Sequence, residues 1–171
     1  MEVESPIPDA YWVSPGRVLA GEYPGSVYHE DARPKLRWLL EAGVSAFVDL
    51  TERGELKPYF KVATEEADRL GAAPEYQRRP IRDASTPSVE AMTEILDAID
   101  AAVEAGKVVY LHCMAGLGRT GVVVGCYLVR HGRSGEEALE EIARLRRDLP
   151  GGSTTSPYTE GQRNMVLEWI Q

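Results

Sequence analysis

The chain has 171 residues, and its 19 Lys and Arg are outnumbered by 27 Asp and Glu, giving a formal net charge of −8. Hydrophobic residues make up 43% of the chain and charged residues 27%, which is typical of a folded globular protein and argues against intrinsic disorder. This length indicates one domain over residues 1–171, and the acidic balance excludes a nucleic-acid partner held by bulk charge. A small basic pocket for an anion remains compatible with that balance.

The composition shows no segment for export or membrane insertion. No window approaches the roughly 18 apolar residues that span a bilayer, so we expect no membrane partner. Residues Met1–Tyr11 are acidic and proline-rich, and they lack the basic and apolar regions of a signal peptide. Cys113 and Cys126 are too few for a disulfide framework or a zinc cluster, so we expect free thiols in a reducing cytoplasm. We also expect a monomer.

Strands and helices alternate along the first half of the chain. Residues 1–25 predict a loop-rich lead, because prolines and glycines recur through it, with one short strand near Val18–Ala20. The pattern then predicts, in order, a helix over Glu30–Glu41 closed by Gly43, a buried strand over Val44–Leu50, a helix over Lys61–Leu70 ended by Gly71, and a strand over Glu75–Ile81.

The second half continues this alternation. The clearest helix spans Pro87–Ala105, with Thr86 as its N-cap and one apolar stripe at intervals of three and four residues. A capping box of Ser134 and Glu137 opens a later helix. The other predicted elements are a strand over Lys107–His112, a helix over Arg119–His131 whose Val122–Val124 run would also suit a strand, and a last helix from near Ser156. This order predicts an α/β domain with a covered sheet.

The most informative stretch is HCMAGLGRTG, from His112 to Gly121, between a predicted strand and a predicted helix. One interpretation is a dinucleotide site, because three of its glycines spell G-x-G-x-x-G. That fold needs an acidic residue at the end of the next strand, about 20 residues on, whereas Glu141 falls in an amphipathic helix. A second interpretation is Cys–His catalysis. Neighbouring strand side chains point to opposite faces, so His112 is poorly placed to take the Cys113 proton and more naturally braces the loop.

A third interpretation is a phosphate cradle with a nucleophile at its base. Backbone N–H groups of the loop from Met114 to Arg119 can converge on one anion, and the N-terminus of the following helix adds positive charge. The same field favours a thiolate at Cys113. Arg119 can bring its planar fork to two phosphate oxygens, and Thr120 carries a hydroxyl near the sulfur. We favour this interpretation, because a plain buried cysteine beside a turn would leave Arg119 unexplained.

With these residues in view, the sequence resembles the cysteine-based protein tyrosine and dual-specificity phosphatases. Cys113, Arg119 and Thr120 match the signature C-x5-R-[ST], and HC-x-AGLGRTG is especially similar to the compact dual-specificity branch. Upstream, PIRDASTPS resembles the loop P-I-x-D-x-x-x-P-S that carries the family's general acid, which is Asp83 here. The Trp that tyrosine-specific members carry in that loop is absent, which also points to the compact branch.

The resemblance implies a central, mainly parallel sheet flanked by helices, with the phosphate-binding loop between a strand and a helix. It implies that Cys113 attacks phosphorus to form a phosphocysteine and that Asp83 protonates the leaving oxygen. A looser match, near Ser156, implies that Gln162 positions water. Substrate-binding roles are implied for Met114, Ala115, Gly116, Leu117, Gly118, Arg119 and Gln162. We expect no metal or other cofactor, since thiolate, guanidinium and loop amides supply the nucleophile and the charge.

The expected partner is a phosphorylated protein or a small phosphomonoester. Phosphatases of lipid and inositol phosphates often place Lys in the phosphate-binding loop, and this loop has no Lys. Phosphoproteins and aryl phosphates are therefore the favoured substrates, and inositol phosphates are the alternative. From other classes, a non-catalytic phosphate-binding module would lack Cys113, Arg119 or the acid, and a sulfurtransferase would not need Asp83. If Asp83 is structural, Glu52 or Glu55 would be the next candidates for the acid.

Overall fold

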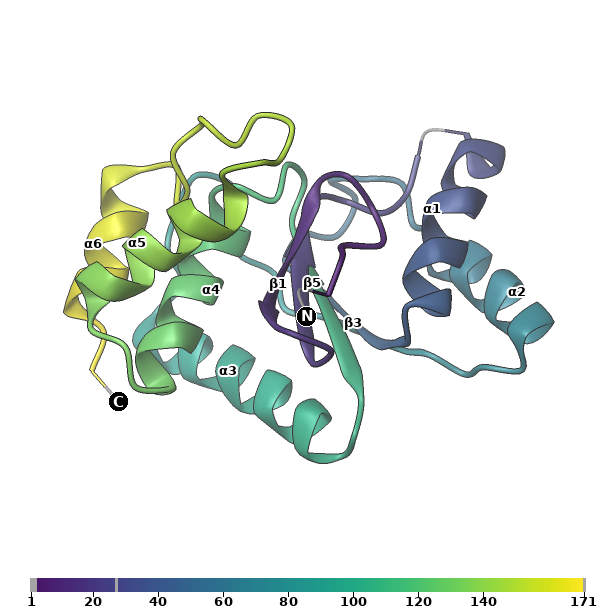
Figure 1. Cartoon of the computed structure of the whole chain (residues 1–171), viewed down its shortest axis with the longest axis horizontal. Coiled ribbons are helices and arrows are strands. Elements are labelled where there is room, and N and C mark those ends of the chain that lie inside the picture. The colour runs from purple at the N-terminus through teal and green to yellow at the C-terminus, as the bar shows by residue number, and fades with distance from the viewer. Residues whose placement is uncertain (1–2, 27, 171) are drawn as a thin grey trace.

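The computed structural model describes residues 3–26 and 28–170, which form one five-stranded sheet with helices on both faces (Figure 1). The strands are β1 (Ala10–Ser14), β2 (Val18–Gly21), β3 (Val44–Asp49), β4 (Glu75–Arg78) and β5 (Val108–His112). They lie in the order β1-β2-β5-β3-β4, with β1 antiparallel to β2 and the other neighbours parallel. The predicted α/β fold with a mainly parallel sheet is confirmed.

Helices cover the two faces of this sheet unequally. They are α1 (His29–Glu41), α2 (Phe60–Leu70), α3 (Val89–Glu104), α4 (Arg119–Arg130), α5 (Gly135–Arg146) and α6 (Glu160–Glu168). Figure 1 shows α1 and α2 on one side of the strands and the other four helices on the opposite side. The larger group surrounds α4, which is buried from Arg119 to Leu128. This burial explains its apolar sequence and confirms a helix over the Val122–Val124 run.

Side-chain alternation along the central strand β5 creates two hydrophobic cores. Tyr110 packs into one core with apolar residues of α1 and α2. Val109 and Leu111 face the other way and pack with residues from α3 to α6. Because both faces of β5 are covered, its carboxyl end is held firmly from either side of the sheet.

The lead of the chain is more ordered than its sequence predicts. Two strands, β1 and β2, lie in residues 1–25, where we expected one. β1 is one of the two edge strands, and its adjacent residues Tyr11 and Trp12 pack into opposite cores. Prolines and glycines lie on both sides of β1 and predict a loop there, so this five-residue strand is not recognised from the sequence.

Helix α3 begins later than predicted. Its first residue is Val89, because Ser88 rather than Thr86 is the N-cap, and the Ser88 hydroxyl accepts a first-turn N–H at 3.1 Å. A serine two residues after a threonine offers the same capping chemistry, so composition alone does not decide between them. The capping box of Ser134 and Glu137 is confirmed at the start of α5.

Helix α6 also begins later, at Glu160 rather than near Ser156. A capping box of Thr159 and Gln162 opens it, and this box was not predicted. Ser156 has another task, since its hydroxyl donates to the carbonyl of Leu117 at 2.7 Å. The segment before α6 therefore supports the loop between β5 and α4.

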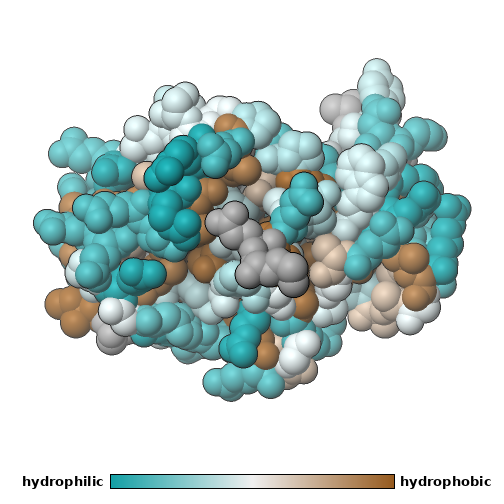
Figure 2. Space-filling view, viewed as in Figure 1, coloured by the Kyte–Doolittle hydropathy of each residue, from teal (hydrophilic) through white to brown (hydrophobic). Residues whose placement is uncertain are grey.

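The surface in Figure 2 is mainly hydrophilic, with apolar residues scattered among polar ones. Across residues 3–26 and 28–170, no helix combines the length and the apolar character needed to cross a bilayer.

Candidate active site

The loop of residues 113–118 joins the end of β5 to the start of α4. β5 lies between its parallel neighbours β2 and β3, so the loop opens at the carboxyl edge of the sheet, where α/β folds place their ligands. Cys113 is the first residue of the loop and is buried. Gly118 is the N-cap of α4, and no described side chain caps the first amides of this helix. Those amides therefore remain available to an anion.

Close backbone contacts hold the loop in shape. Gly116 has a φ of +72°, and a Cβ there would lie 2.6 Å from the backbone carbon of Gly21 in β2, so this position requires glycine. The carbonyl of Met114 accepts a hydrogen bond from the N–H of Tyr23 at 2.9 Å. With the Ser156 bond described above, two loop carbonyls are tied to surrounding segments. The loop amides are thereby left to bind a ligand.

Arg119, the first residue of α4, is 1% exposed and is clamped by Glu55. Its Nη1 donates to Glu55 Oε2 at 2.8 Å, and its Nη2 donates to Oε1 at 2.6 Å. Nη1 also donates to the carbonyl of Ile81 at 3.1 Å. Burial alone would lower the pKa of Arg119, but the Glu55 hydrogen bonds outweigh it, so that this pKa is raised. The same hydrogen bonds lower the pKa of Glu55. The pair is therefore charged, and the guanidinium is fixed in orientation.

Asp83 lies on the loop between β4 and α3 and is well exposed, with 71% of its side chain open to solvent. Its Oδ1 is 3.5 Å from Nη2 of Arg119 and accepts a hydrogen bond from the N–H of Ala84 at 2.9 Å. Ala84 adopts a φ of +58°, which is uncommon for a residue other than glycine. This turn directs the carboxylate toward the guanidinium.

One cavity of about 350 Å³ brings the predicted nucleophile, acid and arginine together. Its lining consists of Asp83, Ala84, Cys113, Met114, Ala115, Leu117, Gly118, Arg119, Tyr158 and Gln162. This size is within the range of small-molecule sites. Two predicted site residues lie outside the lining: Gly116 packs against β2, and Thr120 is buried.

Comparison with known proteins connects this geometry to a family. A family model described as "Polymorphic toxin system, DSP-PTPase phosphatase" matches residues 24–133, which hold the loop, Arg119 and Asp83. The chain belongs to this phosphatase family. It is 30% identical over 128 residues to the phosphatidylinositol 3,4,5-trisphosphate 3-phosphatase and protein-tyrosine-phosphatase PTEN1 of Arabidopsis thaliana, covering 74% of this chain and 30% of the relative.

A second curated relative is the dual specificity protein phosphatase CDC14B of Mus musculus, 45% identical over 69 residues, which cover 40% of this chain and 13% of the relative. The chain thus spans less than a third of either relative. The crystal structure of Tk-PTP in the active form has a TM-score of 0.74 at 30% identity, covering 95% of this chain and 99% of that one. The structure of PTPMT1 in complex with PI(5)P shares the fold, with a TM-score of 0.68 at 21% identity and coverage of 94% and 93%.

In this member of the family, His112 supports the loop between β5 and α4 and makes no hydrogen bond to the thiol of Cys113 among the described residues. Burial lowers the pKa of His112, so its ring is neutral. Its Nδ1 lies 3.0 Å from the carbonyl oxygen of Cys113, which can only accept, so Nδ1 carries the proton. Nε2 then accepts from the hydroxyl of Tyr59 at 2.7 Å. Both ring nitrogens are used, and the Cys–His interpretation of the sequence is wrong.

The dinucleotide interpretation is also wrong. Glu141, the acid at the required spacing, lies inside α5 and not at the end of a strand. Both of its carboxylate oxygens accept hydrogen bonds from Arg144 at 2.8 Å.

Thr120 and Gln162 lie at different depths in the candidate site. Thr120 is fully buried, and its hydroxyl has no hydrogen-bond partner in the described part of the chain. Gln162 lies in the cavity wall, where its Oε1 accepts from the N–H of Thr159 at 3.1 Å and its Nε2 donates to the carbonyl of Ser85 at 3.1 Å. Gln162 therefore ties α6 to the loop that carries Asp83.

Sequence reasoning missed the role of Glu55 and missed Tyr158 altogether. Glu55 was considered only as a substitute acid, and the 64 positions that separate it from Arg119 give no local signal of their pairing. Tyr158 lines the cavity although 65% of its surface is exposed. It lies inside the segment whose resemblance pointed to Gln162, which is the signal that could have found it.

Proposed function

We propose that this phosphatase hydrolyses phosphotyrosine, phosphoserine or phosphothreonine in proteins, or small aryl phosphates, through a phosphocysteine intermediate. The observation that carries the proposal is the single cavity lined by Cys113, Asp83 and Arg119. A nucleophile, a proton donor and a phosphate-binding cation are the parts that a two-step displacement requires.

The hydrogen bonds of Arg119 support a specific mode of phosphate binding. Glu55 and the Ile81 carbonyl use three of its five N–H donors. The remaining two, on Nε and Nη2, lie along one edge of the guanidinium and can donate to two oxygens of one phosphoryl group. Together with the loop amides and the N-terminus of α4, they would stabilise the equatorial oxygens as charge develops on them.

In the first proposed step, the thiolate of Cys113 attacks phosphorus, an S–P bond forms, and the P–O bond to the leaving group breaks. Asp83 gives its proton to the departing oxygen, so the product leaves as an alcohol or phenol. The exposure of Asp83 suits this role, because the carboxylate must exchange protons with solvent between turnovers.

In the second step, water attacks the phosphocysteine, a P–O bond forms, and the S–P bond breaks to return the thiolate. Asp83, now ionised, takes a proton from that water. Gln162 retains one amide N–H and one oxygen lone pair beyond its two hydrogen bonds, and we assign them to the attacking water. The hydroxyl of Thr120, which has no hydrogen-bond partner in the described part of the chain, would donate to the departing sulfur.

The lining of the cavity favours a substrate with one phosphate and an apolar leaving group. Arg119 is its one cation and Asp83 its one carboxylate among the lining residues. Met114 and Tyr158 add apolar and aromatic surface and are 50% and 65% exposed. A substrate with several phosphates would find no second cation in this lining.

The second candidate is hydrolysis of an inositol phosphate or phosphoinositide by the same mechanism. The observation that favours it is the similarity to the Arabidopsis relative, which is named a phosphatidylinositol 3,4,5-trisphosphate 3-phosphatase as well as a protein-tyrosine-phosphatase. For either substrate we expect a monomer in a reducing compartment, because an oxidised thiol cannot act as the nucleophile.

The proposal is tested by measuring turnover on a panel with a phosphotyrosine peptide, a phosphoserine peptide, an inositol phosphate and thiosulfate. We expect phosphate release from one or both peptides and its loss in Cys113→Ser, while Cys126→Ser stays active. Faster release from the inositol phosphate would favour the second candidate. Turnover of thiosulfate alone would indicate a sulfurtransferase, and binding without any turnover would indicate a phosphate-binding module.

A further inference from the structure

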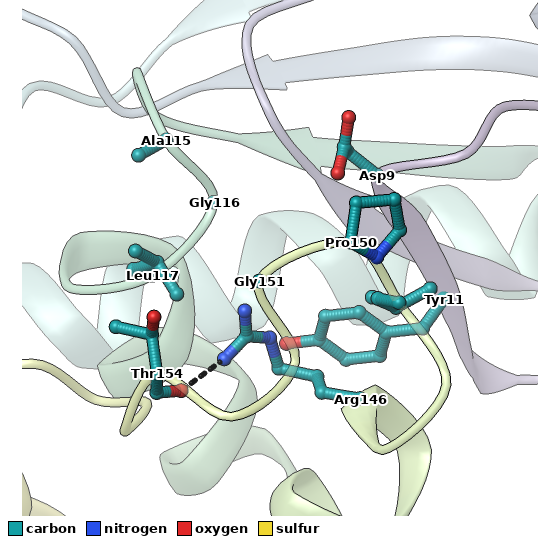
Figure 3. Close-up of a pocket in the computed structure, with 10 residues that line it drawn as sticks. Asp9, Tyr11, Ala115, Gly116, Leu117, Arg146, Pro150, Gly151 and Thr154 are labelled. Carbon is teal, nitrogen blue, oxygen red and sulfur yellow. Dashed lines mark hydrogen bonds between the residues drawn. The ribbon is translucent and has the colours of Figure 1, made fainter.

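A second, smaller cavity lies beside the phosphate loop. Figure 3 shows it between β1, loop residues 115–117 and the segment that follows α5. Its volume is about 90 Å³, room for about three waters or one tetrahedral oxyanion. Its polar side chains are Asp9, Tyr11, Arg146 and Thr154. None of these side chains takes part in the proposed reaction.

Arg146 is the cation of this cavity, and its charge is not balanced by an ion pair. Its surface is 5% exposed, and across the described residues no carboxylate lies within ion-pair distance of it. The other buried charges are paired: Asp49 with Arg78, Glu66 with Arg33, and Arg119 with Glu55. Arg146 Nη1 donates to the carbonyl of Thr154 at 3.0 Å (Figure 3). A buried guanidinium with donors to spare favours an anionic ligand.

Tyr11 provides an independent sign of a missing partner. Its hydroxyl is buried and has no hydrogen-bond partner among residues 3–26 and 28–170. In Figure 3 the hydroxyl is directed toward the guanidinium end of Arg146. Burial raises the pKa of Tyr11 far above its ordinary value, although the charge of Arg146 opposes the shift, so the hydroxyl keeps its proton and can donate. Two donors on two elements thus face one small cavity.

Asp9 restricts which anion fits. Its carboxylate lines the same cavity (Figure 3) and would repel an oxyanion that carries no proton. Hydrogen phosphate can accept from Arg146 and Tyr11 and still donate its own proton to Asp9. Sulfate has no proton to donate at neutral pH, and a phosphomonoester loses its last proton near pH ~6. Inorganic phosphate retains one.

We propose that this cavity binds inorganic phosphate as hydrogen phosphate, with Arg146 and Tyr11 as donors and Asp9 as the acceptor. Binding at this site does not depend on the proposed function, but its consequence for turnover rests on it, because phosphate is then the product of the reaction. Ala115 and Leu117 line both cavities, so the bound product would contact the loop that released it. Phosphate would then inhibit turnover by a noncompetitive component in addition to competition at Cys113.

Isothermal titration calorimetry of the full chain tests this site. Inorganic phosphate is titrated at neutral pH in saturating sodium sulfate, because sulfate fills the catalytic loop as a tetrahedral oxyanion but lacks the proton for Asp9. We expect one saturable phosphate site to remain. Tyr11→Phe should weaken it about tenfold, the size expected for one hydrogen bond to a charged ligand. The matched control Tyr28→Phe removes an exposed hydroxyl and should bind phosphate like the wild type.

Asp9→Asn provides a second readout that a structural role would not change. An amide can donate to an oxyanion as well as accept, so this variant should bind sulfate, which would then displace phosphate. Tyr11→Phe should unfold at a temperature equal to or above that of the wild type, because the Tyr11 hydroxyl has no hydrogen-bond partner among the described residues to lose.

Three results would overturn the proposal. Absence of a second saturable phosphate site both with and without sulfate would mean that the cavity holds only water. Unchanged phosphate binding in Tyr11→Phe would place the ion elsewhere. Displacement of phosphate by sulfate in the wild type would show that Asp9 does not select for a protonated anion. None of these measurements uses turnover, so a chain that binds phosphate here but hydrolyses no phosphomonoester would contradict only the proposed function.

Discussion

At the scale of single residues, the proposed site depends on how Arg119 is held. Glu55 and Ile81 occupy three of its five N–H donors, which leaves the Nε–Nη2 edge for the phosphoryl group that we propose it binds. Because Glu55 already fixes the orientation of the guanidinium, little entropy would be lost on binding the proposed phosphoryl group. The sequence predicts Arg119 from its spacing to Cys113. It does not predict the clamp, because Glu55 reaches Arg119 only once β3 and β5 pair.

Arg119→Lys should lower kcat/KM by at least about 100-fold although the charge is kept. A lysine is a point charge that cannot bind Glu55 and fork two phosphate oxygens together. Steady-state kinetics with an aryl phosphate measure this, with the exposed Arg133→Lys as the matched control. A loss under tenfold would mean that Arg119 does not face the phosphate.

Glu55→Gln should flatten the dependence of stability on pH. Because Arg119 lowers the folded-state pKa of Glu55, the pair adds stability above the ordinary pKa of 4.5 and loses it as pH falls through the lower folded value. The variant should be about 1 kcal/mol less stable at neutral pH and should converge with the wild type in acid. Urea unfolding over a pH series measures this, with the exposed Glu94→Gln as control. Parallel curves at every pH would show that the clamp contributes no charge effect.

At the scale of elements, the loop between β5 and α4 has its shape because β2 lies against it. Gly116 in this loop approaches the backbone of Gly21, at the end of β2, so closely that a side chain at position 116 would not fit. The glycine pattern in the sequence indicates a tight loop, but not which glycine faces a ligand and which faces β2. That distinction needs β2, a strand from the opposite end of the chain, and local sequence does not place it.

Gly116→Ala should therefore lower stability and activity by more than the cost of placing alanine at a positive φ. Gly16 has a similar φ of +69°, and beyond its chain neighbours no described residue lies within 4 Å of an added Cβ. Gly16→Ala therefore isolates the cost of the angle, about 1 kcal/mol. Gly116→Ala should cost more and lower kcat/KM by about 100-fold, because the loop must shift. Thermal unfolding and kinetics on both variants measure this. Equal stability and activity in the two would contradict the close approach.

The loop between β4 and α3 has its own test in Asp83→Ala. A general acid contributes about 10²–10⁴-fold only where the leaving oxygen is basic. The variant should lose far more activity on phosphotyrosine, whose phenol has a pKa of ~10, than on a nitrophenyl ester. Rapid-quench kinetics compare the two substrates, with the exposed Asp148→Ala as control. Equal losses would make Asp83 a structural residue, and Glu52 would be the next candidate, since Glu55 is committed to Arg119.

At the scale of the whole molecule, features set by local sequence are predicted, and features set by the order of strands in the sheet are not. The order of strands and helices, the buried α4 and the loop at the end of β5 are predicted, because each depends on a local pattern. β1 is missed because it is a short edge strand beside prolines. The starts of α3 and α6 are misplaced because alternative capping residues lie within a few positions. Contacts such as Glu55 with Arg119 depend on strand order, which one sequence does not reveal.

The most direct test of the account is to trap the covalent intermediate. A phosphotyrosine peptide is mixed with the protein, the mixture is quenched on the time scale of a first turnover, and the digested chain is examined by mass spectrometry. We predict a phosphoryl group on the peptide that contains Cys113 and none on that of Cys126, whose pKa is raised to about 12 by burial. Turnover without phosphocysteine at Cys113, or a phosphoryl group on another residue, would contradict the account.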